Sequence, residues 1–481
     1  MDPFALIIFG ITGNLSAIKL LPALYDLEEH GLLPEEVTII GTARDAISRE
    51  DFAKLFDNAL HQENRHHQHP INPEVAKKLL SRISYMHGDL TDPKFYSKLK
   101  TELDQKQNSC PSCRNRIFYL ATYPNLYQTI FSNLRATKLN NQDEGWSRLM
   151  IEKPIGHDLA SAKELDKLLN QYFNEDQIYR LDHYLGKETL QNILTFRFGN
   201  CIFEPLINKE FVDHIQVTAA EDFGIGSRGG YYDETGHLKD VGQNHLLQML
   251  AFSTMENPNE FSNVAITQKR IDILNALKAD PKKLVLGQYD GYRSELHVKS
   301  NSQTNTFFAF RTEISNDRFR GVPIYVRGGK KMKQTATEIS IVFKNRPNRL
   351  HLNLPSGEEP NVLIYRIQPN EAIVLKVLSK MPGLNTALEP SYMQFCYKHL
   401  SSDIFDPYLR LFYDAVSGDQ TFFNDAEEIE SEWSFIDRLS TGNHTAMPYK
   451  PGSWGPKEAD KLIKADGREW LEPSMAFCNI R

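Results

Sequence analysis

The fold is decided by Phe4-Ala5-Leu6-Ile7-Ile8-Phe9 and the loop that follows it, Gly10-Ile11-Thr12-Gly13-Asn14-Leu15. The apolar run ends in glycine, which predicts a buried parallel strand. A helical pattern continues to Leu27, so the loop glycines would let the backbone turn tightly and approach a diphosphate at the helix N-terminus. Because the spacing is G-x-x-G rather than G-x-G-x-x-G, a simple glycine turn between a strand and a helix is the alternative.

The second predicted strand, Val37-Thr38-Ile39-Ile40, ends in Gly41-Thr42-Ala43-Arg44. In a dinucleotide-binding fold this point meets the adenosine ribose, where an acid favours NAD and an arginine can pair with the 2′-phosphate of NADP. Arg44 therefore predicts NADP as the coenzyme. Asp45 lies beside it in the sequence, and an ordinary surface arginine is the alternative interpretation.

Further strand-like runs at 83–87, 117–120, 149–151 and 177–180 alternate with helix-like segments at 94–103, 126–134 and 160–173. This alternation predicts an α/β domain over residues 1–179, with a Rossmann-like, doubly wound parallel sheet that binds a dinucleotide. Ligands bind such sheets beyond the carboxyl ends of the strands. The residues that follow these ends include Asp89, Leu90, Tyr123, Pro124 and Lys153.

The pattern changes from about residue 190 onward. Strand-like runs at 213–221, 306–314, 339–344, 361–368 and 372–378 lack regular intervening helices, and helices are predicted at 242–253, 267–277, 407–415 and 425–439. Residues 180–481 are therefore expected to form an α+β domain with a large, mainly antiparallel sheet. The charged segment 425–437 is expected to be a surface or subunit-contact helix.

Between the two predicted domains lies a dense polar stretch, Arg180-Leu181-Asp182-His183-Tyr184-Leu185-Gly186-Lys187-Glu188. If a helix begins near Asp182, His183 and Lys187 share one face because they are four residues apart. Two cationic or proton-bearing groups side by side repel unless an anion lies between them, and a phosphate is the natural candidate. A salt-bridged surface helix is the alternative.

A second polar stretch, Asp240-Val241-Gly242-Gln243-Asn244-His245, opens an apolar helix. On an ideal α-helix Asp240 and His245 are about 140° apart, so they would line different sides of one pocket. A satisfied core histidine is the alternative interpretation of His245.

The totals narrow the class of protein. The 481 residues are 41% apolar and 24% charged, with a net charge of −7, which is ordinary for a globular protein and offers no global attraction to nucleic acid. No apolar run is long enough to span a membrane, and the start lacks the basic leader of a signal peptide. The five cysteines are few and odd in number, which indicates a reducing cytoplasm.

No metal site is predicted. His61, His66, His67 and His69 lie in a polar stretch typical of a solvated loop. Cys110-Pro111-Ser112-Cys113 has the spacing of half a zinc site, but the sequence offers no second pair to complete it.

Four long motifs occur in order: Ile151–Gly156 (IEKPIG), Arg180–Glu188 (RLDHYLGKE), Asp240–His245 (DVGQNH) and Gly321–Lys330 (GVPIYVRGGK), with Gly452–Pro456 (GSWGP) near the C-terminus. Through them the chain resembles the glucose-6-phosphate dehydrogenase family, of a bacterial type, over nearly its whole length. The resemblance implies oxidation of glucose 6-phosphate at C1 to 6-phosphogluconolactone with hydride transfer to NADP⁺, the first oxidative step of the pentose phosphate pathway. It also implies a cytoplasmic homodimer or homotetramer.

The resemblance further implies a role for each matching residue. His245 would be the general base, with Asp182 orienting its imidazole. His183, Tyr184 and Lys187 match the pocket for the substrate phosphate. The residues matching sugar contacts are Glu221, Asp240 and Lys330, and Lys19 and Lys153 would lie near both substrate and coenzyme. The predicted coenzyme contacts are Gly10, Thr12, Gly13, Asn14, Leu15, Arg44, Asp89, Leu90, Tyr123, Pro124 and Lys153.

Four positions depart from the family pattern. Asn14 replaces an aspartate, Ile18 and Thr335 replace basic residues, and Gly242 stands where a bulkier apolar residue is common. Asn14 and Ile18 leave open whether the protein uses NAD as well as NADP. Two other hypotheses are a dehydrogenase of the same fold that acts on unphosphorylated sugars, and a dinucleotide-binding sensor without catalysis. The sensor is disfavoured because both His245 and Asp182 are present.

Overall fold

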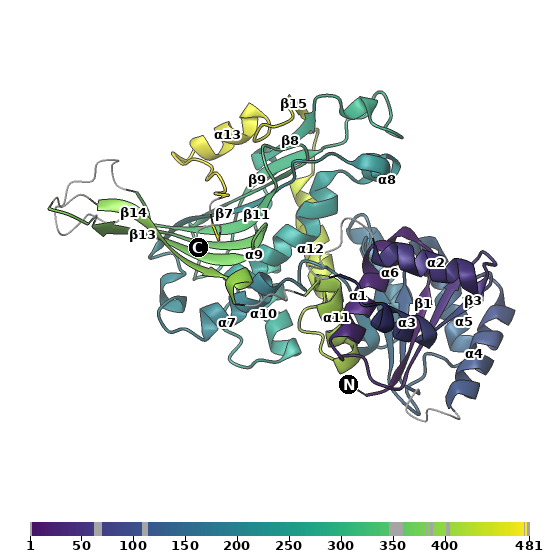
Figure 1. The fold of residues 1–481 in the computed structure, drawn as a ribbon. Coiled ribbons are helices and arrows are strands. Elements are labelled where there is room, and N and C mark those ends of the chain that lie inside the picture. The colour runs from purple at the N-terminus through teal and green to yellow at the C-terminus, as the bar shows by residue number, and fades with distance from the viewer. Residues whose placement is uncertain are drawn as a thin grey trace. The chain divides into compact units, whose positions relative to one another are not determined.

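The computed structural model describes residues 2–61, 70–107, 114–345, 359–380, 382–384, 388–400, 405–475 and 477–478. The chain forms two compact units, each with its own sheet (Figure 1). The N-terminal unit is made of Met1–Gly156, Ala160–Gly186 and Phe405–Asp425, and the C-terminal unit of His157–Leu159, Lys187–Ile404 and Ala426–Arg481. The chain therefore crosses between the units inside the polar stretch 180–188. Residues 405–425, which the prediction assigned to the second domain, belong to the first unit.

Six parallel strands form the sheet of the N-terminal unit, in the order β3-β2-β1-β4-β5-β6. They are β1 Phe4–Phe9, β2 Val37–Ala43, β3 Ile83–His87, β4 Arg116–Leu120, β5 Ser147–Ile151 and β6 Ile178–Arg180. The apolar strand β1 is buried along its whole length. The chain runs outward from β1 to β3 and then returns to β4 on the other side of β1. The predicted doubly wound sheet is thus confirmed, and its strand order reverses between β1 and β4, where such sheets bind ligands.

Helices connect these strands and bury their apolar faces. They are the π-helix η1 Ser16–Leu20, α1 Leu21–Glu29, α2 Arg49–Leu60, α3 Pro73–Arg82, α4 Pro93–Gln107, the short η3 Pro124–Leu126, α5 Tyr127–Ala136, α6 Leu159–Asn170 and α11 Pro407–Ser417. Ser48, Asn72 and Asp406 cap α2, α3 and α11 by accepting hydrogen bonds from backbone N–H groups of the first turn. The helix α11 comes from the remote segment 405–425 and contacts α1.

Nine strands form the sheet of the C-terminal unit, in the order β14-β13-β12-β11-β7-β10-β9-β8-β15. They are β7 Val212–Ala220, β8 Leu284–Tyr289, β9 Phe307–Glu313, β10 Pro323–Gly329, β11 Ala336–Phe343, β12 Val362–Gln368, β13 Ala372–Lys380, β14 Leu388–Cys396 and β15 Met447–Tyr449. Only the pairs β7–β10 and β8–β15 are parallel. The predicted mainly antiparallel sheet is confirmed, although the sequence did not indicate β8, β10, β14 or β15.

The helices of the C-terminal unit are α7 Glu188–Phe198, α8 Gly229–Thr235, the π-helix η7 Leu238–Leu246, α9 Leu247–Thr254, α10 Asn263–Ala276, α12 Ala426–Leu439 and α13 Lys457–Lys464. The expectation that α12 lies on the surface is wrong. Glu428, Glu432, Phe435 and Ile436 are fully buried. The carboxylates among them are satisfied inside the unit, because Arg270 pairs with Glu428 and two glutamines donate to Glu432.

Two of the five cysteines are joined in the C-terminal unit. Cys396 at the end of β14 forms a disulfide with Cys478, whereas Cys201 is free and exposed, and Cys110 and Cys113 lie outside the described residues. The C-terminal segment reaches β14 across the sheet, where Arg327 and Arg366 donate to the carbonyls of Leu471 and Ser474. These contacts bring together two cysteines that are 82 residues apart in the sequence. No rule of sequence spacing predicts a pairing over that separation.

Within the ranges given above, no helix is both long enough and apolar enough to cross a membrane.

Candidate functional site

The loop after β1 is shaped for a close approach of backbone to ligand. Gly10 has a φ of +94°, and a Cβ there would lie 2.4 Å from the backbone oxygen of Ala121, which follows β4. A side chain would therefore collide with the neighbouring strand end at the point where the strand order reverses. The Gly13 N–H and the Ser16 hydroxyl both donate to the Gly10 carbonyl, at 3.0 Å each. This tight turn fits a dinucleotide diphosphate.

All the predicted coenzyme contacts follow the carboxyl ends of β1 to β5. Beyond β2, Arg44 is exposed, and its charge helps to lower the pKa of Asp89, after the larger effect of hydrogen bonds from Thr91. The Asp45 carbonyl accepts a hydrogen bond from the Tyr85 hydroxyl. Tyr123, after β4, is 81% exposed. The sheet edge therefore presents one basic side chain and one accessible aromatic ring beside the glycine turn.

A partly buried carboxyl lies at this edge. Glu152, in the IEKPIG motif after β5, accepts a hydrogen bond from the Tyr119 hydroxyl at 2.5 Å. Burial raises its pKa to about 7, against the smaller opposing effects of Tyr119, Lys153 and Tyr408. The next peptide bond, Lys153–Pro154, is cis. Sequence reasoning did not single out Glu152, because an acid beside a lysine is usually a surface pair.

The N-terminus of α11 adds two residues that the sequence interpretation missed. Asp406 pairs with Lys19 at 3.3 Å, and the Tyr408 ring lies 5.7 Å from the Lys19 ammonium. The same ring stacks at 6.2 Å from the imidazole of His183. Lys19 and His183 thus both lie beside the Tyr408 ring, and the partly buried carboxyl of Glu152 also interacts with this tyrosine, within the N-terminal unit. Only the Asp-Pro start of a helix could have indicated this segment, and that signal says nothing about its partners.

Replacement of Glu152 by glutamine should flatten the dependence of stability on pH. The pKa of Glu152 is raised from 4.5 to about 7 in the folded protein, so between these values the folded state holds a proton that the unfolded state releases. The free energy of unfolding therefore falls as pH rises through this window. Relative to wild type, Glu152→Gln should gain about 3 kcal/mol between about pH 4.5 and about pH 8.

Urea unfolding of both proteins across this range measures the effect. Glu164→Gln, on the polar side of α6, is the matched control and should follow wild type at every pH. Parallel curves for wild type and Glu152→Gln would show that Glu152 is already ionised in the folded state.

The C-terminal unit holds the predicted sugar contacts. Lys330, which follows β10, is nearly buried and forms an ion pair with Glu221, which follows β7. Its ammonium lies 4.9 Å from the ring of Phe223 and 5.9 Å from that of Tyr232. Burial, and next the charges of Asp240 and Glu221, raise the pKa of Tyr232 well above its usual value. Lys330 therefore lies beside the Tyr232 ring, and the charges of Asp240 and Glu221 also act on this phenol.

The start of α7 corrects the expected geometry of His183 and Lys187. The helix begins at Glu188, and Lys187 precedes it in an extended conformation, so the two residues do not share a helical face. Asp182 instead accepts a hydrogen bond from the Tyr184 N–H at 2.9 Å, which closes a turn. A Cβ on Gly186 would lie 2.5 Å from the Pro407 carbonyl oxygen, so this glycine packs against the start of α11. Both contacts hold residues 182–186 out of a helix.

His245 lies on a π-helix rather than an α-helix. In η7 the backbone closes from residue i to i+5, so residues five apart lie on the same side of the helix. Asp240 and His245 are five apart, and the expected separation of about 140° therefore does not apply. Asp240 accepts a hydrogen bond from the Tyr231 hydroxyl at 3.3 Å and lies 3.8 Å from Arg228.

The structure explains two departures from the family pattern. A Cβ on Gly242 would lie 2.8 Å from the Phe308 ring, so the ring occupies the space of the missing side chain. Thr335 donates from its hydroxyl to Asp222 at 2.6 Å, and Lys333 pairs with Glu472 at 2.8 Å. Lys333 is therefore engaged elsewhere and does not replace the basic residue that Thr335 lacks.

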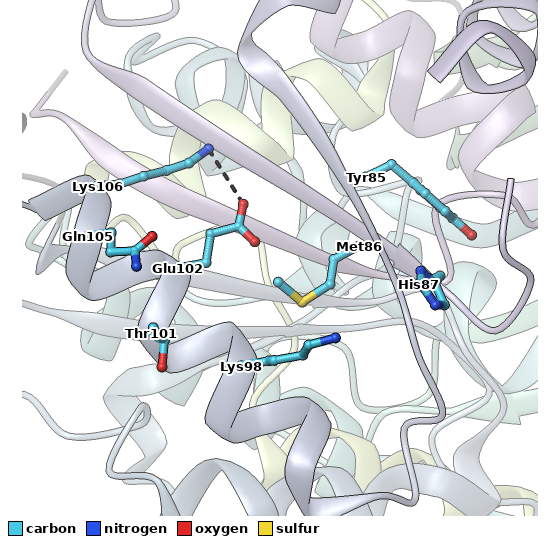
Figure 2. Close-up of a pocket in the computed structure, with 8 residues that line it drawn as sticks. All are labelled: Tyr85, Met86, His87, Lys98, Thr101, Glu102, Gln105 and Lys106. Atoms are coloured by element: carbon cyan, nitrogen blue, oxygen red, sulfur yellow. Dashed lines mark ion pairs between the residues drawn. The ribbon is translucent and has the colours of Figure 1, made fainter. Parts of the chain in front are cut away.

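A separate hollow of about 570 Å³ lies along the outer edge of the parallel sheet, between β3 and α4. Figure 2 shows Lys106 paired with Glu102 on α4, at 3.8 Å, and His87 and Tyr85 on the strand side. Among the described residues that line this hollow, none belongs to the predicted coenzyme or substrate set. It is therefore distinct from the candidate site.

Comparison with known proteins covers both units. Residues 7–192 match the family model "Glucose-6-phosphate dehydrogenase, NAD binding domain", and residues 194–471 match "Glucose-6-phosphate dehydrogenase, C-terminal domain". The chain is 39% identical to glucose-6-phosphate 1-dehydrogenase of Chlamydia pneumoniae over 97% of this chain and 96% of that protein. It is 37% identical to the Bacillus subtilis enzyme of the same name, over 97% of each chain.

Solved structures agree with these matches. A glucose-6-phosphate dehydrogenase in complex with its substrate glucose 6-phosphate has a TM-score of 0.89 and 33% identity, with 98% of this chain and 99% of that chain covered. The Mycobacterium avium enzyme has a TM-score of 0.87, also at 33% identity, over the same shares of the two chains.

Proposed function

The chain belongs to the glucose-6-phosphate dehydrogenase family, and from this premise we propose that it oxidises glucose 6-phosphate at C1 to 6-phospho-D-glucono-1,5-lactone with NADP⁺ as hydride acceptor. The resemblance seen in the sequence is thereby confirmed, and the protein is an oxidoreductase with a nicotinamide-coenzyme domain. The observation that carries the proposal is the arrangement in the C-terminal unit. His245 and Asp240 lie on one side of η7, and Lys330 pairs with Glu221 while its ammonium lies 5.9 Å from the ring of Tyr232.

In the proposed reaction, His245 accepts the proton of the C1 hydroxyl as the C1–O bond gains double-bond character. A neutral imidazole titrates near pH 6.5 in the absence of perturbation, so it can act as a base near neutrality. Asp182 would orient the imidazole and stabilise the imidazolium that forms, as carboxylates do in other acid–histidine pairs. The bound NADP⁺ supplies the acceptor for the hydride that leaves C1. Glu221, Asp240 and Lys330 would hold the sugar hydroxyls so that C1 faces the base.

The remaining polar residues would bind the charged ends of the two ligands. His183, Tyr184 and Lys187 are the proposed contacts of the substrate phosphate, and Lys19 and Lys153 would lie where substrate and coenzyme meet. Arg44 would pair with the 2′-phosphate of NADP⁺, which the exposure of its side chain beyond β2 supports. Asn14 and Ile18 are exposed beside the glycine turn, so dual use of NAD⁺ and NADP⁺ is the second candidate function.

A homodimer or homotetramer acting in the cytoplasm is also proposed. Its support is an apolar surface on the nine-stranded sheet, where a groove of about 520 Å³ is lined by Phe203, Phe343 and Leu375 among others. On β14, Met393 is 63% exposed and Phe395 44% exposed. Contiguous apolar surface of this kind is typical of a subunit contact. Sedimentation velocity measures the oligomeric state.

The direct test compares initial rates with glucose and glucose 6-phosphate, each with NAD⁺ and NADP⁺. Several charge-assisted hydrogen bonds to the phosphate, each worth about 1.5–3 kcal/mol, should raise kcat/KM for the ester by at least about 10³-fold over glucose. We expect NADP⁺ to be preferred. Equal rates with free glucose would contradict the phosphate assignment, and no turnover with any pair would favour the sensor.

A further inference from the structure

A fully buried carboxylate holds the helix that carries His245. Glu432, on α12, accepts a hydrogen bond from the Gln243 amide at 2.8 Å and another from the Gln248 amide at 2.8 Å. Gln243 lies on η7 and Gln248 on α9, so the two amides flank His245 along the chain. All these groups belong to the C-terminal unit. The carboxylate is 0% exposed, and its two acceptor bonds therefore form away from water.

The spacing of the two glutamines depends on how the helix is wound. Gln243 and Gln248 are five residues apart, which on an α-helix would direct them about 140° away from each other. The π-turn brings residues five apart to one side, and this lets a single carboxylate accept from both amides. The same winding brings Asp240 and His245 to one side, because they too are five apart. The contact to Glu432 and the alignment of the polar site thus share one geometric requirement.

We propose that Glu432 is a positioning residue for His245, which it serves by holding the π-winding of η7 at the junction with α9; this inference rests on the proposed function of His245. A buried carboxylate paired with neutral amides is expensive compared with apolar packing of the same volume. Such a group is more useful for fixing one conformation than for raising stability. Without the two hydrogen bonds to Glu432, η7 can relax toward α-helical winding, which rotates His245 relative to Asp240.

Three variants at this position separate positioning from stability. Glu432→Leu keeps the approximate volume but removes both acceptors, and kcat should fall about 10- to 100-fold, as expected for a misplaced catalytic group. In Glu432→Gln, the new amide oxygen can still accept from Gln243. The new amide N–H group can donate to the side-chain oxygen of Gln248 if the Gln248 amide rotates by 180°. Both glutamines therefore keep a partner, and kcat should stay within about 3-fold of wild type. The dissociation constant of NADP⁺ should change less than about 2-fold in both variants, because the coenzyme binds the N-terminal unit.

If Glu432→Leu does not fold, a triple variant takes its place in the experiment. It combines Glu432→Leu with Gln243→Met and Gln248→Met, so that all three polar side chains become apolar. This triple variant leaves no buried amide without a partner, and buried polar clusters replaced in this way often keep their stability. It should show the same loss of kcat as the single variant.

Glu428 provides the matched control on the same helix. It is equally buried, but it pairs with Arg270 of α10 at 2.6 Å. The double variant Glu428→Leu with Arg270→Met therefore removes a buried polar pair of α12 without touching the two glutamines. Its kcat should stay within about 2-fold of wild type.

The outcomes distinguish this inference from the proposed function. In a His245→Asn background, Glu432→Leu should cause no further loss, because Glu432 acts through His245. If His245→Asn is inactive and Glu432→Leu lowers only the melting temperature, the positioning role is overturned while the general base stands. If His245→Asn itself retains activity, the base assignment fails first. An equal loss of kcat in the Glu428 control would reduce Glu432 to a purely structural residue.

Discussion

His245→Asn should lower kcat by about 10³- to 10⁴-fold, the contribution expected of a general base. Asparagine is close to histidine in size and polarity, but it cannot accept a proton at neutral pH. The proposed substrate contacts at Glu221, Asp240 and Lys330 are unchanged by this replacement. We therefore expect glucose 6-phosphate to bind with a dissociation constant within about 5-fold of wild type.

Absorbance of the reduced coenzyme measures turnover, and calorimetric titration measures substrate binding. The same unit offers a matched control in His214, a buried histidine whose Nδ1 lies 2.7 Å from Asp213. Burial lowers the pKa of His214, so it resembles a catalytic histidine in its environment but lies at a distance from the polar stretch in sequence. His214→Asn should keep kcat within about 3-fold. Retention of most activity by His245→Asn would exclude it as the base.

The parallel sheet was predictable because its central strand is a continuous apolar run and its other strands alternate with helical segments. β1 is buried at every residue, and a run of that kind has few other structures available to it. By contrast, β10 contains Arg327 and two glycines, and β14 contains Pro390 with several exposed residues, so neither shows the alternation or the apolar run that marks a strand. The place of β10 is set in part by parallel pairing with β7, which lies far away in the sequence, whereas β14 is placed by antiparallel pairing with the preceding strand β13.

The candidate site was predictable only where its residues lie in long motifs. The backbone conformation around these residues was not predictable. The π-turn of η7 depends on contacts with α12, and the turn at residues 182–186 depends on Pro407. Glu152, Asp406 and Tyr408 were missed for the same reason. Each gains its significance from a partner in another segment, and a charged helix such as α12 reads as exposed until the partners of its carboxylates are known.

Lys187→Met should raise the KM for glucose 6-phosphate by about 10- to 150-fold, the value of one charge-assisted hydrogen bond of about 1.5–3 kcal/mol. Lys187 precedes the first turn of α7, where the Thr189 N–H donates to Glu371 at 2.7 Å. Burial raises the pKa of Glu371, and the charge of Lys187 is the largest opposing effect. The ammonium therefore lies near a helix N-terminus and a partly buried acid, where a phosphate dianion can be held by charge and by backbone donors.

Removal of this one cation should act on the ester alone. Free glucose carries no phosphate, so its kcat/KM should change less than about 2-fold in Lys187→Met. The preference for glucose 6-phosphate over glucose should therefore fall by the same factor by which the KM for the ester rises. Lys187→Arg keeps the charge but changes its geometry, so its KM should rise less than about 10-fold. Rising salt should shrink the difference between wild type and Lys187→Met, because screening weakens the interaction being tested. An unchanged KM in Lys187→Met would place the phosphate elsewhere. A parallel loss with glucose would instead mean that Lys187 supports the start of α7, because a structural defect lowers turnover of both sugars alike.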